Sequence, residues 1–205
     1  MSDKYTTVEQ QASYGIGLQM GQQLAAQPFE GLEISAVQAG LAAAFSGEAS
    51  EVSHQDLEAA FNEINSRMQK EAEEKAEVAA AEGIKFLEEN AKREEVIVTD
   101  SGLQYEVIKQ GEGEKPTVDS TVRTHYHGTF INGEVFDSSV VRDQPAEFPV
   151  SGVIAGWTEA LQLMPVGTKL KLFVPSELAY GERGAGGSIP PHSALVFEVE
   201  LLDIL

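Results

Sequence analysis

The sequence predicts an α+β protein, with an all-helical first half and a second half built as a bent antiparallel β-sheet wrapped on one short α-helix. Only one proline, Pro28, precedes about Glu95, whereas the other seven prolines, most glycines and many β-branched residues follow it. Before Glu95 the chain is rich in Ala, Gln and Glu, and its apolar residues recur at helical spacing. After Glu95 they alternate as in strands. We therefore divide the chain into a helical region (1–52), a long connecting helix (53–94) and a strand-rich domain (95–205).

Two helices are expected in the first region. The first runs from Val8 to about Ala26, where apolar residues recur every fourth position at Ala12, Ile16 and Met20. It also contains three glycines, and each costs about 1 kcal/mol relative to alanine inside a helix, so they indicate close approach to another helix. The second helix lies near Ser35 to Phe45 and ends at Ser46-Gly47, a typical C-terminal stop.

A third, much longer helix is expected from Ser53 to about Lys92. The Ser53 hydroxyl can cap the amide of Asp56, and the helix would span on the order of 60 Å. Its apolar seam consists of Leu57, Phe61, Ile64 and Met68, and it stops there. We interpret the remainder as an arm that crosses solvent, with a helix packed on its own domain as the alternative. Such narrow stripes make a small core, and this predicts dimerisation through the residues before about Met68.

Strands, turns and one short helix account for the second half. Apolar residues alternate from Val122 to Phe130 and again from Leu195 to Leu201, as in strands with one face inward. Between Gly156 and Met164 the spacing becomes helical, and this helix would fill the concave side of the sheet. Asn132-Gly133 predicts a tight hairpin turn, and Met164-Pro165-Val166-Gly167 predicts a turn after the helix.

Composition narrows the range of functions. The chain has no cysteine, so disulfides, thiolate metal sites and cysteine nucleophiles are excluded, and a reducing compartment is permitted. The net charge of −19 disfavours nucleic acid and anionic membranes, because both require basic surfaces. Neither a secretory n-region nor a run approaching the roughly 20 apolar residues of a membrane span is found. We expect a soluble, unexported, cytoplasmic protein that needs no cofactor.

Three patterns raise alternative chemistries. His125 and His127 would face one side of a strand, and a pair of imidazoles can bind a metal. A third ligand is not evident, so solvated histidines and no metal are expected. Ser138 and Ser139, which follow Asp137, suggest nucleophiles, yet no histidine falls in a motif that would pair with them. The glycines from Gly181 to Gly187 suggest a phosphate cradle, but no following helix or Lys-Ser/Thr completes one, and a mobile surface loop is favoured.

Six short segments, in one order and spacing, carry the main functional signal. They are His125-Tyr126-His127-Gly128, Val135-Phe136-Asp137-Ser138-Ser139, Phe148-Pro149-Val150, Gly152-Val153-Ile154-Ala155-Gly156-Trp157, Leu178-Ala179-Tyr180-Gly181-Glu182-Arg183-Gly184 and Ile189-Pro190-Pro191. From about Thr99 to Leu205 the chain thereby resembles the FK506-binding-protein (FKBP) family of peptidyl-prolyl cis/trans isomerases. The helical half more loosely resembles the two-domain bacterial class that includes the macrophage infectivity potentiators, whose members are V-shaped homodimers.

The resemblance implies an active pocket in residues 95–205. Its catalytic residues would be Asp137, Tyr180, Phe136, Trp157 and Ile154, and its substrate- or inhibitor-binding residues would be Tyr126, Arg142, Phe148, Val153, Ile189 and Phe197. Trp157 would be the floor under the proline ring, with Phe136, Tyr126 and Phe197 as walls. The Ile154 amide and the Tyr180 hydroxyl would bind substrate carbonyls, and Asp137 would polarise the reacting centre and pair with Arg142. In isolation, the aromatic residues would also suit simple core packing.

Three functions follow from different classes of protein. The first is a prolyl isomerase that accelerates proline-limited folding, with unfolded or partly folded proteins as clients, FK506-like macrolides as inhibitors, and an N-terminal homodimer that binds clients as a chaperone. The second is a catalytically weak FKBP-like binding module, and the third is a mainly structural dimeric chaperone. Ala146 and Ala185 stand where many family members have an aromatic residue and a histidine, and both positions belong to the pocket rim.

Overall fold

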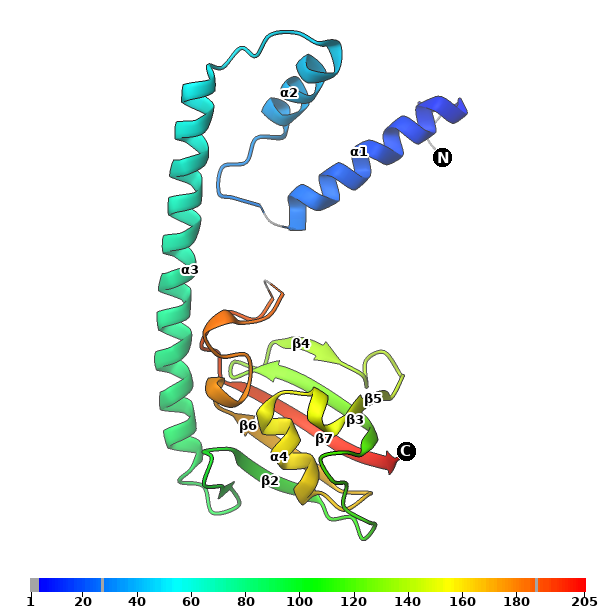
Figure 1. Ribbon diagram of the computed structural model, residues 1–205, viewed down its shortest axis with the longest axis vertical. Helices are drawn as coiled ribbons and strands as arrows, with labels where there is room; N and C mark the ends of the chain where they lie inside the picture. Colours follow the sequence, from blue (N-terminus) through cyan, green and yellow to red (C-terminus); the bar gives the residue numbers. More distant parts are fainter. Residues whose placement is uncertain (1–3, 27, 187) are drawn as a thin grey trace. The chain divides into compact units, whose positions relative to one another are not determined.

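The computed structural model describes residues 4–26, 28–186 and 188–205, and it divides into two compact units (Figure 1). The helical unit comprises the residues up to Lys70, and the sheet unit comprises those from Glu71 onward. Helix α3, His54–Asn90, contributes its first half to the helical unit and its second half to the sheet unit.

The helical unit contains α1 (Val8–Ala26), α2 (Ile34–Ser46) and the start of α3, and the three predicted helices are confirmed. Both predicted caps form. Gly47 ends α2 at φ 70°, and its N–H donates to the Ala44 carbonyl at 3.3 Å. At the start of α3, the Ser53 hydroxyl accepts a hydrogen bond from the Asp56 N–H at 3.1 Å. These ends are set by local chemistry, which explains why the sequence predicts them well.

Apolar side chains of the helical unit lie open to solvent. No side chain is buried in α1 or α2, and Phe45 and Phe61 are 93% and 65% exposed. A Cβ added at any of the α1 glycines would meet nothing within 4 Å in the described part of the chain. The close helix approach that these glycines predict therefore finds no partner within the described residues of a single copy.

The sheet unit is built on a seven-stranded antiparallel sheet in the order β1-β2-β6-β7-β3-β4, with β5 paired to β3. Its strands are β1 (Ile97–Val98), β2 (Gln104–Lys109), β3 (Thr121–Phe130), β4 (Val135–Ser138), β5 (Ala146–Pro149), β6 (Lys169–Val174) and β7 (Leu195–Ile204). Every second residue of β3 from Val122 to Gly128 is buried, as the alternation predicts. Gly133 and Gly167, at φ 87° and 89°, form the two predicted turns.

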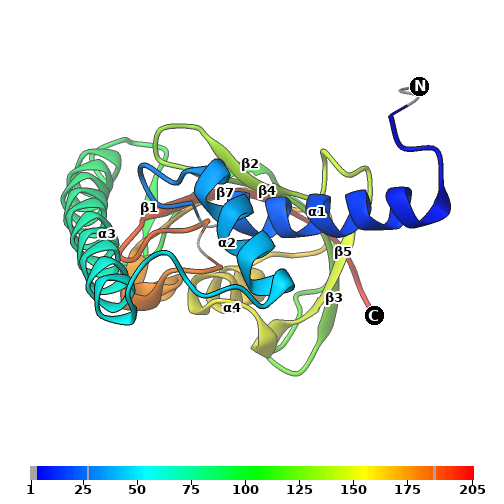
Figure 2. The same cartoon turned by 90° about the horizontal axis from the view of Figure 1, so that it is seen from above.

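Helix α4 (Ala155–Leu163) lies along one face of the sheet (Figure 2). Trp157, Ala160 and Leu161 bury its apolar stripe in the same core as Leu172, Val199 and other sheet residues. Gly156 allows this close approach, because a Cβ there would lie 2.7 Å from a Val174 methyl. Three short 3-10 turns, η1 (Val150–Gly152), η2 (Ser176–Leu178) and η3 (Gly181–Arg183), complete the loops around this helix.

The second half of α3 packs on the sheet unit, so the expectation of an arm that is polar all round beyond Met68 is wrong for residues 76–90. Ala76, Gly83 and Asn90 recur every seven residues and are buried. A Cβ on Gly83 would lie 3.0 Å from the Ala194 Cβ. The Asn90 amide donates to the Gln104 side-chain carbonyl at 2.9 Å, in a buried pair. The seam of large apolar residues does not reveal this face, because its buried positions are small residues and a paired amide. Phe86, whose ring packs on Phe173 with centroids 6.0 Å apart, lies outside the spacing of that seam.

Candidate active site

One pocket of the sheet unit, of about 280 Å³, gathers most of the predicted site residues. We call it the aromatic pocket, and it lies between the start of α4, strands β3, β4 and β7, and the segment around Tyr180. Its lining residues are Tyr126, Phe136, Asp137, Phe148, Gly152, Val153, Ile154, Trp157, Tyr180 and Phe197. Nine of the eleven predicted residues are therefore brought together, and Gly152 was not predicted.

Aromatic rings form the floor and walls of the pocket. Trp157 packs edge-to-face against Tyr126, Phe148 and Phe197, with ring centroids 5.4, 5.9 and 5.4 Å apart. Phe136 packs in the same way on Phe197 at 5.5 Å. Edge-to-face pairs of this kind fix ring orientation as well as burying area. The result is a cavity walled by packed aromatic rings, with Trp157 in the third position of α4 and 4% exposed.

Gly128 of β3 makes room for two of these walls. A Cβ at this position would come within 2.8 Å of the Phe136 ring and 3.0 Å of the Phe197 ring. The sequence shows Gly128 only as an inward strand position, and its contacts across the sheet depend on the pairing of β3 with β4 and β7. Gly128 is therefore a site residue that the strand pattern alone did not single out.

Asp137 is held at the pocket wall by a triangle of polar side chains. Arg142 forms an ion pair with one carboxylate oxygen of Asp137, and the Tyr126 hydroxyl donates to the other. Arg142 also donates to the Tyr126 hydroxyl at 2.8 Å. The Asp137–Arg142 pair agrees with prediction, whereas the hydroxyl of Tyr126, predicted as a wall, is an additional polar contact. Because all its partners donate, Asp137 is fixed as a carboxylate facing the cavity.

Ionisation states follow from these contacts. Burial acts to raise the pKa of Asp137, but hydrogen bonds from Tyr126 and Arg142 outweigh it and hold the pKa below its ordinary value. Burial, together with the Asp137 carboxylate nearby, raises the pKa of Tyr126 and of Tyr180. At neutral pH the pocket thus offers one carboxylate and two neutral phenolic hydroxyls.

Two hydrogen-bond donors remain open for a ligand. The Tyr180 hydroxyl, on a side chain 39% exposed, and the Ile154 N–H have no hydrogen-bond partner among the described residues. Ile154 immediately precedes α4, so its amide belongs to the positive end of that helix. Both donors border the cavity, at positions from which they can reach carbonyl oxygens of a bound peptide.

Two predicted residues do not line the cavity itself. Arg142 lies behind Asp137, with half of its side chain exposed. Ile189 is 7% exposed and packs in the core cluster, while its carbonyl accepts the Ala185 N–H at 2.9 Å. Ile189 therefore supports the loop next to Tyr180. Of the Gly184 to Gly187 stretch, whose mobility the sequence predicts, Gly187 lies outside the described residues.

No histidine was expected to pair with Ser138 or Ser139, because none falls in a suitable motif, and this prediction is wrong. The strand register places His127 opposite Ser138, with 2.9 Å between Nδ1 and the hydroxyl, and His125 Nδ1 lies 3.0 Å from the Ser139 hydroxyl. Both serines are nonetheless buried, at 4% and 0% exposed, and the Ser139 hydroxyl accepts the Tyr126 N–H. They fasten the β3–β4 connection and are not accessible as nucleophiles.

Comparisons with known proteins agree with this geometry. Residues 112–202 match the family model "FKBP-type peptidyl-prolyl cis-trans isomerase", and residues 9–107 match "Domain amino terminal to FKBP-type peptidyl-prolyl isomerase". The chain belongs to the FKBP-type peptidyl-prolyl cis-trans isomerases, in the form that carries this N-terminal domain.

Relatives match along nearly the whole chain. The chain is 57% identical to the FKBP-type 22 kDa peptidyl-prolyl cis-trans isomerase of Escherichia coli K12, over 98% of both proteins. It is 39% identical to the outer membrane protein MIP of Legionella longbeachae, over 97% of this chain and 87% of that protein. The crystal structure of FkpA from E. coli matches with a TM-score of 0.72 and 37% identity over 98% of both chains.

Proposed function

We propose that this peptidyl-prolyl isomerase accelerates proline-limited protein folding, with its chemistry in the aromatic pocket and its clients held by the helical unit. The carrying observation is that apolar rings, one fixed carboxylate and two open donors, Tyr180 and Ile154, border the same cavity. Nothing in the proposed chemistry requires a cofactor, because rotation about an amide breaks no σ bond.

The barrier to that rotation is electronic. Resonance gives the C–N bond partial double-bond character and a barrier of about 18–20 kcal/mol. In the twisted transition state conjugation is lost, and the carbonyl oxygen carries less negative charge. A pocket that removes water from this carbonyl therefore stabilises the twisted state relative to the planar one.

Each pocket element would then have a distinct part. The Trp157 floor and the walls Phe136 and Phe197 would take the proline ring out of water. The Ile154 N–H and the Tyr180 hydroxyl would hydrogen-bond carbonyl groups that flank the proline, so that binding energy favours the twisted prolyl bond. Asp137, fixed by Tyr126 and Arg142, would face the reacting carbonyl and favour the form with less charge on its oxygen.

A peptide assay with and without FK506 tests the pocket assignment. We expect full-length protein to speed cis/trans isomerisation of a short proline peptide, and FK506 to abolish this acceleration. Ala146 and Ala185 leave the rim small, so the macrolide should bind less tightly than to a family member with larger rim residues. Activity without any inhibition would keep the isomerase but remove macrolides from its ligands. No acceleration at all would favour the alternative of a weak FKBP-like binding module.

Client binding and homodimerisation are proposed for the helical unit. Large apolar side chains are exposed in this unit, so one copy of the chain has no buried core there; among them are Ile16, Leu41, Phe45 and Phe61. Pairing of two copies would bury part of this surface and leave the rest for unfolded clients. Analytical ultracentrifugation at micromolar concentration should give twice the mass of one chain, and a single-chain mass would overturn the dimer. A mainly structural dimeric chaperone would suppress aggregation equally well with its pocket inactivated.

We also propose a cytoplasmic location, which the absence of cysteine permits. The described helices include none that is long and apolar enough to cross a membrane. Fractionation of the source cells, probed with an antibody to this chain, tests the proposal. Recovery with periplasmic or envelope markers would overturn it.

A further inference from the structure

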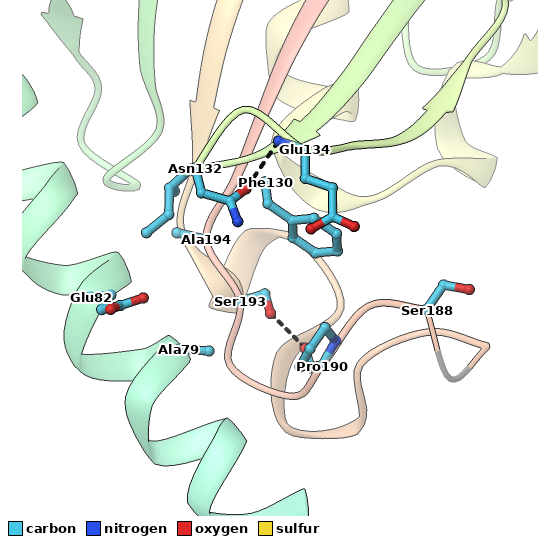
Figure 3. A pocket seen from close by; sticks show the side chains of 10 residues that line it. Ala79, Glu82, Phe130, Asn132, Glu134, Ser188, Pro190, Ser193 and Ala194 are labelled. Atoms are coloured by element: carbon cyan, nitrogen blue, oxygen red, sulfur yellow. Dashed lines mark hydrogen bonds between the residues drawn. The ribbon is translucent and has the colours of Figure 1, made fainter. Parts of the chain in front are cut away.

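A second cavity, of about 320 Å³, opens in the sheet unit (Figure 3). We call it the acidic groove. Helix α3 forms one wall with Ala79 and Glu82, and the β3–β4 hairpin forms another with Phe130, Ile131, Asn132 and Glu134. Residues 188–194 form the remaining wall of the groove, with Ser188, Pro190, Ser193 and Ala194 in its lining. The groove exists because α3 packs on the sheet unit at Gly83 and Ala194.

The lining combines an apolar surface with two carboxylates. Glu82 and Glu134 are its only charged residues, and they project from different walls, α3 and the hairpin (Figure 3). Neither carboxylate has a hydrogen bond or ion pair within the described residues. Two other polar side chains of the lining are hydrogen-bonded: the Asn132 side chain accepts the Glu134 N–H, and the Ser193 hydroxyl donates to the Pro190 carbonyl. The groove therefore presents uncompensated negative charge over apolar side chains.

The groove adjoins the aromatic pocket through shared structure. The Phe130 ring lines the groove and packs on Phe136, which lines the pocket, with centroids 5.2 Å apart. On the other side, Pro190 of the groove directly follows Ile189, which supports the loop beside Tyr180. A polypeptide bound in the pocket thus has a neighbouring surface on which its flanking residues can lie.

We propose that the acidic groove binds a lysine or arginine of the client chain, a few residues away from the proline that occupies the aromatic pocket. This inference rests on the proposed isomerase function. Lysine and arginine fit because their methylene stems pack on apolar surface while the charged head stays at the rim, where Glu82 and Glu134 lie. Phe130, which is half-buried in the groove wall, adds an aromatic ring that can attract the cation. The enzyme would then prefer prolines with basic neighbours in extended sequence.

A peptide series on full-length protein tests the proposal. Each peptide has eleven residues, all neutral except for one lysine, with a proline at the centre. Across the series, the lysine lies two to five residues before or after the proline. Each has a partner with glutamate in place of lysine. Because an extended chain advances about 3.3–3.6 Å per residue, only some offsets can reach the groove. At those offsets we expect kcat/KM for the lysine peptide to exceed that for its glutamate partner by about three- to tenfold at low salt.

Charge reversal provides the decisive comparison. In the double variant Glu82→Lys/Glu134→Lys, the lysine-to-glutamate ratio should fall below one at the same offsets. The ratio within each variant cancels any general change in the pocket. Glu88→Lys/Glu112→Lys, which makes the same change in net charge outside the groove lining, should keep the wild-type ratio. Circular dichroism of both variants checks that they fold, and Glu82→Gln/Glu134→Gln should bring the ratio close to one.

The outcomes separate this proposal from the function on which it rests. If all peptides isomerise at equal rates, the proposed binding of a basic residue in the groove is wrong, while the isomerase function stands. Equal ratios in the groove variant and the control variant would show a general effect of net charge and would also overturn the proposed binding. Failure to isomerise any peptide would instead remove the proposed function itself.

Discussion

The two units of this chain place their apolar side chains in opposite ways. In the helical unit Phe45 and Phe61 lie mostly in solvent, whereas in the sheet unit Leu103, Leu161 and Leu172 are fully buried. Both units obey their sequence patterns, with caps and helical spacing in one and strand alternation in the other. The difference shows that local pattern makes an element, but only enough converging elements make a core. The sheet unit encloses its own core, whereas no side chain of α1 or α2 is buried within one copy.

The largest expected effect locates the chemistry in the sheet unit. A triple variant, Asp137→Ala, Trp157→Leu and Tyr180→Phe, removes the carboxylate, the floor and a donor of the aromatic pocket. We expect peptide kcat/KM to fall about 100-fold or more, since several transition-state contacts are lost together. The mass measured by ultracentrifugation should stay that of the wild type. Wild-type turnover by the triple variant would refute the pocket assignment.

Truncation separates the contributions of the two units to catalysis. A fragment of residues 71–205 keeps the whole sheet unit, including the packed half of α3. It should isomerise short peptides within about twofold of the full chain, because every pocket residue is retained. Catalysis of proline-limited refolding of a protein client should fall about tenfold or more, since tethering by the helical unit is lost. Equal losses in both assays would show that the helical unit does not present clients to the pocket.

A glycine pair tests the packing of α3 on a smaller scale. Gly83→Leu pushes side-chain atoms into Ala194, whereas Gly40→Leu in α2 meets open space within its own chain. Overpacking at Gly83 should lower the free energy of unfolding of the 71–205 fragment by about 1–3 kcal/mol, measured by urea denaturation. In the full chain, Gly40→Leu should leave the unfolding of the sheet unit unchanged. No loss at Gly83 would mean that α3 is released from the sheet unit in solution.

The smallest effect is a dependence of stability on pH. Because the folded pKa of Asp137 lies below its ordinary value of 3.8, its contacts stabilise the fold fully above about pH 5. This contribution is lost as the pH falls from about 4 through the folded pKa. The difference in unfolding free energy between wild type and Asp137→Asn should therefore be constant from pH 5 to 8 and shrink below pH 4. A difference that grows with acidity would contradict the assigned ionisation.

The helix limits, the strand alternation and most residues of the pocket follow from the amino-acid sequence. Ser53 and Gly47 act on neighbouring backbone, and the six motif segments keep their register, so local rules and family resemblance were sufficient. Tertiary structure alone decided which side chains meet across strands. It paired His127 with Ser138 and turned the Tyr126 hydroxyl toward Asp137.

The packing of the second half of α3 on the sheet unit also depends on tertiary contacts. Ala76 and Gly83 carry little hydrophobic signal, yet their small size allows the closest packing, and the Asn90 amide becomes buriable only beside Gln104. The physical reason is common to these cases. A side chain's periodic position depends on its own segment, whereas its contacts depend on the shape and polarity of residues distant in sequence, which pattern alone does not encode.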